Sequence, residues 1–258
     1  MESLKGKKIF ITGATSGIGK SCAYKFAEAG ADLILAARRE SHLKDICIDL
    51  KRKYKVNADW IILDVRNYDE VRKSVDNLPE ENKNISILVN NAGLARGLSK
   101  LHEGSVLDWE EMIDTNVKGL LFVSKCIIPL MLKNNYGHII NIGSVAGREV
   151  YPMGNVYCAT KHAVDANTKS MRMEMVDKNI RVTTIDPGLV ETEFSIVRYR
   201  GNKERAKTAY AGMKPLTPDN VAETIIFAAT RDDNFVIAEM VLLPKAQASA
   251  MIVNRKTE

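Results

Sequence analysis

The sequence predicts an α/β protein, a single doubly wound domain of about seven parallel strands flanked by helices. Short apolar segments alternate along the chain with longer amphipathic ones, as strands alternate with crossover helices. A glycine-rich turn at residues 13–19 follows the first apolar segment directly. No linker, internal repeat or low-complexity tract interrupts the chain, so we expect residues 1–258 to form one domain.

Composition and charge argue against several classes of protein. Hydrophobic residues make up 45% of the chain and charged residues 27%, as in ordinary globular proteins. The net charge of +5 is dispersed and has no aromatic platform beside it, so we expect no nucleic-acid partner. We see no apolar signal region and no apolar run near the roughly 20 residues of a membrane span, so we expect a cytoplasmic protein without a membrane partner. The four cysteines lack Cys-x-x-Cys spacing and the four histidines are scattered, which predicts no metal site.

The first predicted βαβ unit has the features of a dinucleotide site. A strand over 7–12 leads into the glycine turn, a helix over 18–29 ends at Gly30, and a second strand covers 32–37. Glycines in such a turn let the backbone approach a pyrophosphate at the positive end of the helix dipole. The spacing G-x-x-x-G-x-G departs from the general G-x-G-x-x-G fingerprint, so a purely structural turn stays open as the alternative. The cofactor-binding residues predicted here are Gly13, Thr15, Ser16, Gly17, Ile18 and Gly19.

Arg38 and Arg39, at the end of the second strand, predict NADP rather than NAD. An acidic residue about 20 residues beyond the glycines would hold the ribose hydroxyls of NAD. Two guanidinium groups would instead attract a 2′-phosphate. The alternative is a pair of solvated arginines that open the next helix.

Later segments repeat the alternation of strand and helix. We predict helices over 40–53, 109–132, 155–178 and 218–230, a shorter helix from residue 69, and strands over 59–63, 85–89, 138–142, 181–185 and 236–243. Pro218 can open its helix because proline is tolerated in a first turn, whereas Pro129 should kink or stop the helix that holds it.

Short polar or glycine-rich segments follow the predicted strands. They are Asp64-Val65, Asn90-Asn91-Ala92-Gly93, Gly143-Ser144 and Asp186-Pro187-Gly188. Ligands of parallel sheets bind beyond the carboxyl ends of the strands, so these segments should line one crevice.

Tyr157 and Lys161 are candidates for proton transfer. They are four residues apart, so on a helix both side chains lie on one face. A positive neighbour favours the phenolate, so we expect the ammonium to lower the pKa of the phenol. Carbonyl reduction leaves an alkoxide that needs a proton donor and a second hydroxyl beside it, places that Tyr157 and Ser144 could fill. Asn116 inside a helix suggests a hydrogen-bonding role. An ordinary amphipathic helix with a surface lysine stays open as the alternative.

In their order along the chain, these motifs resemble the short-chain dehydrogenases/reductases. The resemblance spans nearly the whole sequence and implies a Rossmann domain in which Tyr157 is the general acid/base and Ser144 orients the substrate oxygen. It implies that Lys161 holds the nicotinamide ribose, and that Asn116 holds a water in a proton relay. Further cofactor-binding residues implied are Asp64, Val65, Asn91, Ala92, Gly93, Pro187, Gly188, Val190 and Thr192. The family usually forms homotetramers, through the helices that begin here near Trp109 and Asn155.

Two stretches, 154–157 and 187–201, look like the NADP-dependent 3-hydroxy acid dehydrogenases, a branch with serine and allo-threonine dehydrogenases and malonic semialdehyde reductase. This implies hydride transfer between NADP(H) and the 3-hydroxyl of a small acid. A carboxylate needs a guanidinium ligand, for which the candidates are Arg148, Arg198 and Arg200. The last two lie in a basic segment, 189–214, that we expect to form a lid. A reductase of another carbonyl (3-oxoacyl thioester, steroid or sugar) and a non-catalytic NADP-binding regulator stay open.

Overall fold

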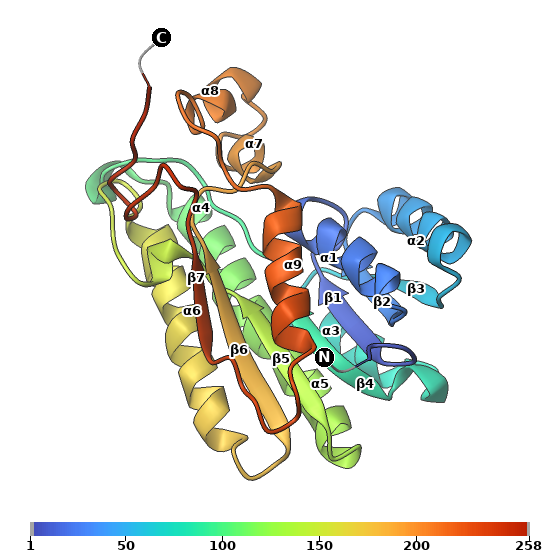
Figure 1. Ribbon diagram of the computed structural model, residues 1–258. Helices are drawn as coiled ribbons and strands as arrows, with labels where there is room; N and C mark the ends of the chain where they lie inside the picture. Colours follow the sequence, from blue (N-terminus) through green and yellow to red (C-terminus); the bar gives the residue numbers. More distant parts are fainter. Residues whose placement is uncertain (1–2, 257–258) are drawn as a thin grey trace.

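The fold is built around one sheet of seven parallel strands (Figure 1). The computed structural model describes residues 3–256. The strands are β1 (Lys8–Thr12), β2 (Asp32–Ala37), β3 (Ala58–Ile62), β4 (Ile85–Asn90), β5 (Gly137–Ile142), β6 (Ile180–Pro187) and β7 (Glu239–Leu242). Their order across the sheet is β3-β2-β1-β4-β5-β6-β7. The predicted fold class is confirmed. The order reverses between β1 and β4, which is where such sheets bind ligands.

Helices cover both faces of the sheet (Figure 1). The longer ones are α1 (Gly17–Glu28), α2 (Glu40–Tyr54), α3 (Tyr68–Asp76), α4 (Val106–Ile113), α5 (Leu120–Lys133), α6 (Asn155–Glu174) and α9 (Pro218–Ala229). Two short helices, α7 (Phe194–Arg198) and α8 (Lys203–Thr208), lie beyond the carboxyl ends of the strands. Within the described residues, these elements agree with the predicted ones to within a few residues at most of their ends.

Alternating side chains on each strand build two separate cores. Ile9 and Ile11 of β1 join a cluster with Phe26 of α1 and Ile225 of α9. Phe10, between them, joins a second cluster on the other face with Ile127 of α5. Successive side chains of a strand point to opposite faces, so a sheet with helices on both sides needs apolar residues at nearly every strand position.

The predicted helix over 109–132 is two helices joined by a π-helical turn. It begins earlier, at Val106, and the segment Asp114–Gly119 has the wider π-helical winding. Pro129 lies inside α5, which continues to Lys133, close to the end predicted at residue 132. Ile127 and Met131, on either side of the proline, are fully buried, and their burial favours continuing the helix to Lys133.

By length and composition, the continuous helical segment Val106–Lys133 could cross a membrane, although we expected no such segment. Its apolar side packs into the second core through Leu120, Val123, Ile127 and Met131. The segment therefore has the features of a core helix. Several apolar side chains on its other side remain exposed, Leu107 the most, at 73%.

Candidate active site

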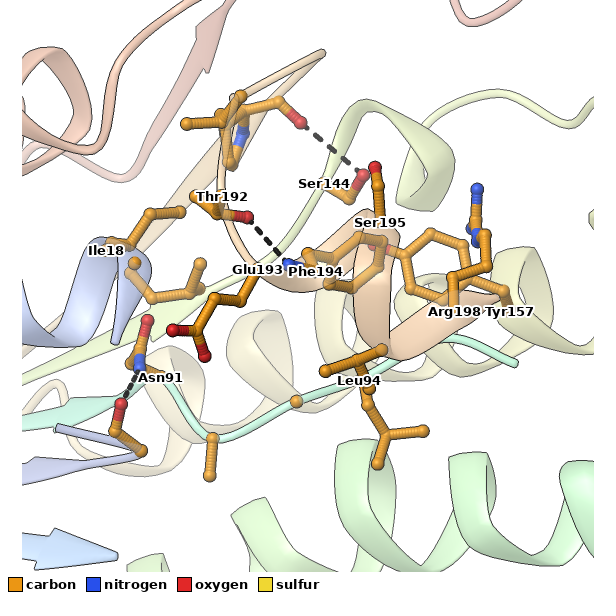
Figure 2. A pocket seen from close by; sticks show the side chains of 18 of the residues that line it. Ile18, Asn91, Leu94, Ser144, Tyr157, Thr192, Glu193, Phe194, Ser195 and Arg198 are labelled. Carbon is orange, nitrogen blue, oxygen red and sulfur yellow. Dashed lines mark hydrogen bonds between the residues drawn. The ribbon is translucent and has the colours of Figure 1, made fainter. Parts of the chain in front are cut away.

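A cavity of about 710 Å³ opens at the carboxyl end of the sheet. Most of the predicted site residues line it, from the glycine turn to the segment after β6 (Figure 2). They are Gly13, Thr15, Ser16, Gly17, Ile18, Arg38, Arg39, Asp64, Val65, Asn91, Ala92, Gly93, Ser144, Tyr157, Lys161, Pro187, Gly188, Val190, Thr192 and Arg198. Gly19, Asn116, Arg148 and Arg200 do not line it.

The glycine turn packs against Asn91 at the point where the strand order reverses. Gly13 and Gly17 have φ of +65° and +51°, values that glycine adopts most easily. The Asn91 Nδ2 donates hydrogen bonds to the carbonyls of Thr12 (2.9 Å) and Gly13 (3.1 Å). A Cβ on Gly19 would lie 2.4 Å from Asn91 Nδ2 and 2.5 Å from the Gly13 oxygen. Gly19 therefore acts from behind the cavity, because it lets helix α1 start close to this turn.

The start of α1 and the two arginines suit an anionic cofactor. Ser16 caps α1 without a side-chain hydrogen bond, so the first N–H groups of the helix keep their capacity to bind a phosphate. The Arg39 guanidinium donates to Thr15 Oγ1 at 2.9 and 3.1 Å and pairs with Glu193 at 3.1 Å. Arg38 lines the cavity rim and, within residues 3–256, has no carboxylate partner. The residues present therefore fit a dinucleotide that carries an extra phosphate.

Ser144, Tyr157 and Lys161 line the same cavity from two separate segments. Ser144 follows β5, and its Oγ accepts a hydrogen bond from Ala146 N (3.1 Å) and donates one to the Pro187 oxygen (3.4 Å). Lys161 is buried on α6, and its Nζ donates to the Ile142 oxygen at 2.8 Å. A Cβ on Gly93 would lie 3.7 Å from Lys161 Nζ, so a glycine after β4 leaves the ammonium accessible from that side.

Burial dominates the acid–base chemistry of this cluster. It raises the pKa of Tyr157 above its ordinary value, and the field of Tyr151 adds to the rise, while Arg198 and a hydrogen bond with Ser144 lower it. Burial lowers the pKa of Lys161 to about 8, against the opposing effect of Asp186. We expected Lys161 to be the main cation acting on the Tyr157 pKa, but Arg198 is the cation with the largest lowering effect.

Asn116 lies in the π-helical turn behind Gly93. Its Oδ1 accepts from Leu94 N at 2.8 Å, and its Nδ2 donates to the Leu94 oxygen (2.8 Å) and to Thr160 Oγ1 (3.1 Å). The amide thus ties the chain after β4 to α6, the helix that holds Tyr157. Isolated π-turns often occur at functional sites because they reorient side chains inside a helix.

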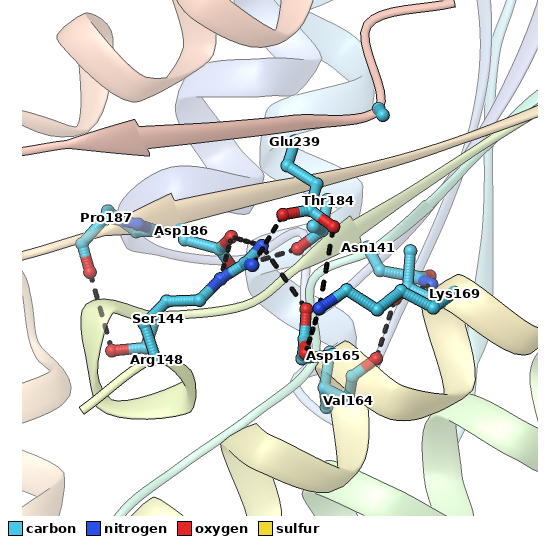
Figure 3. A network of polar contacts seen from close by, with 12 residues as sticks. Asn141, Ser144, Arg148, Val164, Asp165, Lys169, Thr184, Asp186, Pro187 and Glu239 are labelled. Atoms are coloured by element: carbon cyan, nitrogen blue, oxygen red, sulfur yellow. Dashed lines mark hydrogen bonds and ion pairs between the residues drawn. The ribbon is translucent and has the colours of Figure 1, made fainter. Parts of the chain in front are cut away.

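Arg148, one of the three arginines predicted to bind the substrate carboxylate, does not line the cavity. Three carboxylates hold its guanidinium instead, those of Asp186 (2.6 Å), Glu239 (2.5 Å) and Asp165 (3.3 Å) (Figure 3). The network joins the turn after Ser144 to β6, β7 and α6. Burial raises the pKa of Asp186, and Arg148 opposes that rise. Arg200 also lies outside the cavity, where it pairs with Asp108.

The segment after β6 contributes groups to the cavity that sequence reasoning missed. Phe194 packs edge-on against the Tyr157 ring at 5.6 Å between centroids, and Glu193 reaches Arg39. Tyr151 and Gln247 also line the cavity. Gly154 is the sequence feature that could have indicated the position of Tyr151. A Cβ on Gly154 would lie 2.2 Å from the Tyr151 ring, so a glycine is needed there. No sequence pattern around Gln247 indicates that it lines the cavity.

Fold and site together define an oxidoreductase that binds a dinucleotide. The chain belongs to the short-chain dehydrogenase family, whose model, described as short chain dehydrogenase, matches residues 7–202. The resemblance to this family is thereby confirmed.

Three relatives share nearly the whole length of the chain. An NADP-dependent 3-hydroxy acid dehydrogenase of Schizosaccharomyces pombe is 45% identical, with 99% of each chain covered. Sulfoacetaldehyde reductase 2 of Chromohalobacter salexigens is 39% identical, with 96% of this chain and 98% of that one covered. The closed form of a serine dehydrogenase complexed with NADP⁺ has a TM-score of 0.90 and 39% identity, with 97% of this chain and 100% of that one covered.

The substitution Arg148→Met should destabilise the protein by about 3–5 kcal/mol, because it leaves the Asp186 carboxylate buried without its cation. Urea unfolding followed by circular dichroism measures this change in the free energy of unfolding. The matched control is Arg52→Met, whose exposed pair with Asp49 should contribute less than about 1 kcal/mol. Equal effects of the two substitutions would mean that the network does not stabilise the fold.

Proposed function

We propose that this protein is an NADP-dependent dehydrogenase that moves a hydride between NADP(H) and the 3-hydroxyl or 3-oxo group of a small acid. The observation that carries the proposal is that Ser144, Tyr157 and Lys161 line one cavity with the glycine turn and Arg38. Relatives of 45% and 39% identity that are named for NADP-dependent 3-hydroxy acid or serine chemistry support the cofactor and the substrate class.

In this proposal, each polar group of the site has one task. NADPH, when bound, supplies the hydride that adds to the carbonyl carbon. Tyr157 gives its phenolic proton to the oxygen that becomes an alkoxide, and Ser144 donates a hydrogen bond to the same oxygen. Lys161 holds the nicotinamide ribose beside them, and Arg198 is the cation that favours the phenolate left on Tyr157. Asn116 positions the chain behind Gly93 and supports a water in the proton relay. Oxidation of the alcohol uses the same groups in reverse.

The cofactor is placed by groups of the first three strands. The N-terminus of α1 and the glycine turn bind the pyrophosphate, while Arg38 and Arg39 bind the 2′-phosphate of NADP. Asp64 and Val65 line the adenosine side with Ala92. Asn91 and Gly93 line the cavity after β4, and Pro187, Gly188, Val190 and Thr192 line it after β6. Thr192 is assigned to the carboxamide of the nicotinamide.

A second candidate substrate is an aldehyde that carries a sulfonate. The relative from Chromohalobacter salexigens is named a sulfoacetaldehyde reductase. In sulfoacetaldehyde the anionic group is one methylene from the carbonyl carbon, the same spacing as in a 3-oxo acid. Assays of both substrates under one set of conditions decide which the enzyme prefers.

We also propose that residues 189–214 form a lid, that the protein forms a homotetramer and that it works in the cytoplasm. In this segment, residues of α7 line the cavity, α8 follows further along the chain, and Glu193 pairs with Arg39. For assembly, apolar Leu121 on α5 is 37% exposed, and small residues such as Ala166 leave the outer side of α6 open to close approach. The cysteines in the described chain are all free, as expected in the cytoplasm.

The substitution Tyr157→Phe should lower kcat about 100- to 10,000-fold, because the phenyl ring has no proton to give. NADPH binding, measured by quenching of its fluorescence, should stay within twofold, since the ring itself is kept. Turnover is followed by the absorbance of NADPH with 3-hydroxypropionate or L-serine. A variant that retains most of its activity would overturn the proton-donor assignment.

The substitution Arg38→Leu should weaken NADPH binding by about 10- to 100-fold, because a charge-assisted contact to the 2′-phosphate is lost. Binding of NADH, which lacks that phosphate, should not change. Fluorescence titrations with both cofactors measure the two affinities. A parallel loss for NADH would show that Arg38 acts on the fold of the cavity rather than on the phosphate.

The double substitution Leu121→Glu and Ala166→Glu should split the tetramer into smaller species, because it places charges in the proposed interface. Size-exclusion chromatography with light scattering measures the mass in solution. Ile48→Glu on α2, a site that is 63% exposed, is the control and should leave the mass of the assembly unchanged. A tetramer that survives the double substitution would exclude this interface.

A further inference from the structure

We propose that Arg198 and Tyr151 form an anion subsite beside Tyr157, which binds the acidic group of the substrate one methylene from the reacting carbon. This inference rests on the proposed function, because it takes Tyr157 as the group that meets the substrate oxygen. The subsite would select substrates that carry a carboxylate or sulfonate at a fixed distance from the carbonyl.

The first argument is that Arg198 has no anion of its own within the described residues. Other arginines near this end of the sheet pair with acids, as Arg96 does with Glu111 at 2.6 Å and Arg148 with Asp186. Arg198 has only a phenol, since its Nη2 donates to the Tyr151 hydroxyl at 2.9 Å. Its Nε is buried without a hydrogen-bond partner. A guanidinium stays charged in proteins, and a half-buried cation without a counter-ion is costly. A ligand anion would remove this cost.

The second argument is the position of Arg198. Its guanidinium carbon lies 5.1 Å from the centroid of the Tyr157 ring and 5.3 Å from that of Phe194 (Figure 2). In a 3-oxo acid the carboxyl carbon is roughly 2.5 Å from the carbonyl carbon, two bonds away. A charge-assisted hydrogen bond adds about 2.8 Å. One small molecule can therefore place its carbonyl oxygen on the phenol and its anion on the guanidinium.

The third argument is that contacts with neighbouring segments hold both groups in place in this position of the proposed lid. The Arg198 oxygen accepts a hydrogen bond from Gly97 N at 2.9 Å, and Arg96 Nη1 donates to the Val197 oxygen at 2.6 Å. These bonds fix α7 to the loop after β4. Tyr151 packs on the backbone at Gly154, where no other side chain would fit. Groups fixed in this way suit recognition, because little side-chain freedom is lost when the ligand binds.

The subsite also distinguishes substrates by charge. An acid gains contacts that a neutral alcohol of the same length does not. A longer spacer between carbonyl and anion would carry the anion past Arg198. Bulky neutral substrates would leave the Arg198 charge without a counter-ion, so they should be poor substrates.

The test compares Arg198→Leu with Arg200→Leu, a matched control two residues away whose side chain lies outside the cavity. KM and kcat are measured with NADP⁺ for 3-hydroxypropionate and for neutral propane-1,3-diol. Arg198→Leu should raise KM for the acid about 10- to 100-fold and leave KM for the diol unchanged. Arg198→Lys keeps the charge and should restore part of the affinity. Tyr151→Phe should have a smaller effect in the same direction.

Binding without turnover gives a second measurement. Malonate, which cannot be oxidised at a hydroxyl, is titrated by calorimetry into the enzyme with NADP⁺ bound. It should bind to the unchanged protein and to Arg200→Leu, but not to Arg198→Leu. NADPH fluorescence confirms that each variant is folded.

The outcomes separate the subsite from the proposed function. Equal changes of KM for acid and diol, or unchanged malonate binding in Arg198→Leu, would overturn the subsite and leave the function standing. Malonate binding through Arg198 without oxidation of any 3-hydroxy acid by the unchanged protein would support the subsite and overturn the function.

Discussion

All seven strands end at one edge of the sheet, and this constraint brings the distant parts of the sequence into one site. Gly13 follows β1, Asn91 follows β4, Ser144 follows β5 and Gly188 follows β6. Loops at one edge lie close together even when they are far apart in sequence. The hydrogen bonds from Asn91 to Thr12 and Gly13 then fix the point where the strand order reverses. The arrangement of the strands therefore brings the residues of the proposed active site together.

A buried ion network supports the same edge from behind. Asp186 is nearly fully buried, and its charge is balanced by Arg148, which also reaches Glu239 on β7. The residue after Asp186, Pro187, accepts a hydrogen bond from Ser144, so the network is one peptide unit from a reacting group. Arg148 and Arg198 are both arginines, but their surroundings differ. Carboxylates of the protein surround Arg148. Arg198 has none beside it in the described residues, and in the proposed subsite it binds the carboxylate of a ligand.

Local sequence patterns predicted the strands and helices because the formation of these elements depends mainly on residues that are close together in the chain. Apolar runs, glycines and the Tyr157–Lys161 spacing depend on neighbours in the chain, and strand and helix positions followed from them. Partners far away in the sequence could not be predicted in this way. The carboxylates that pair with Arg148 come from three other elements, α6, β6 and β7. Tyr151 reaches the cavity because Gly154 has no side chain to clash with its ring. Pro129 also followed local rules, since α5 ends at Lys133, close to the predicted end of that helix.

The proton on Tyr157 is held by opposing effects. Burial raises the pKa of Tyr157 and Arg198 lowers it. In the proposed mechanism, burial suits a donor to a developing alkoxide, and Arg198 favours the phenolate that remains after transfer. A substrate anion on Arg198 would offset that second effect while the substrate is bound. The phenol would then keep its proton until hydride transfer creates an oxygen basic enough to take it. In the proposed subsite and mechanism, Arg198 both recognises the substrate acid and acts on the pKa of Tyr157, so substrate selection and proton delivery depend on one side chain.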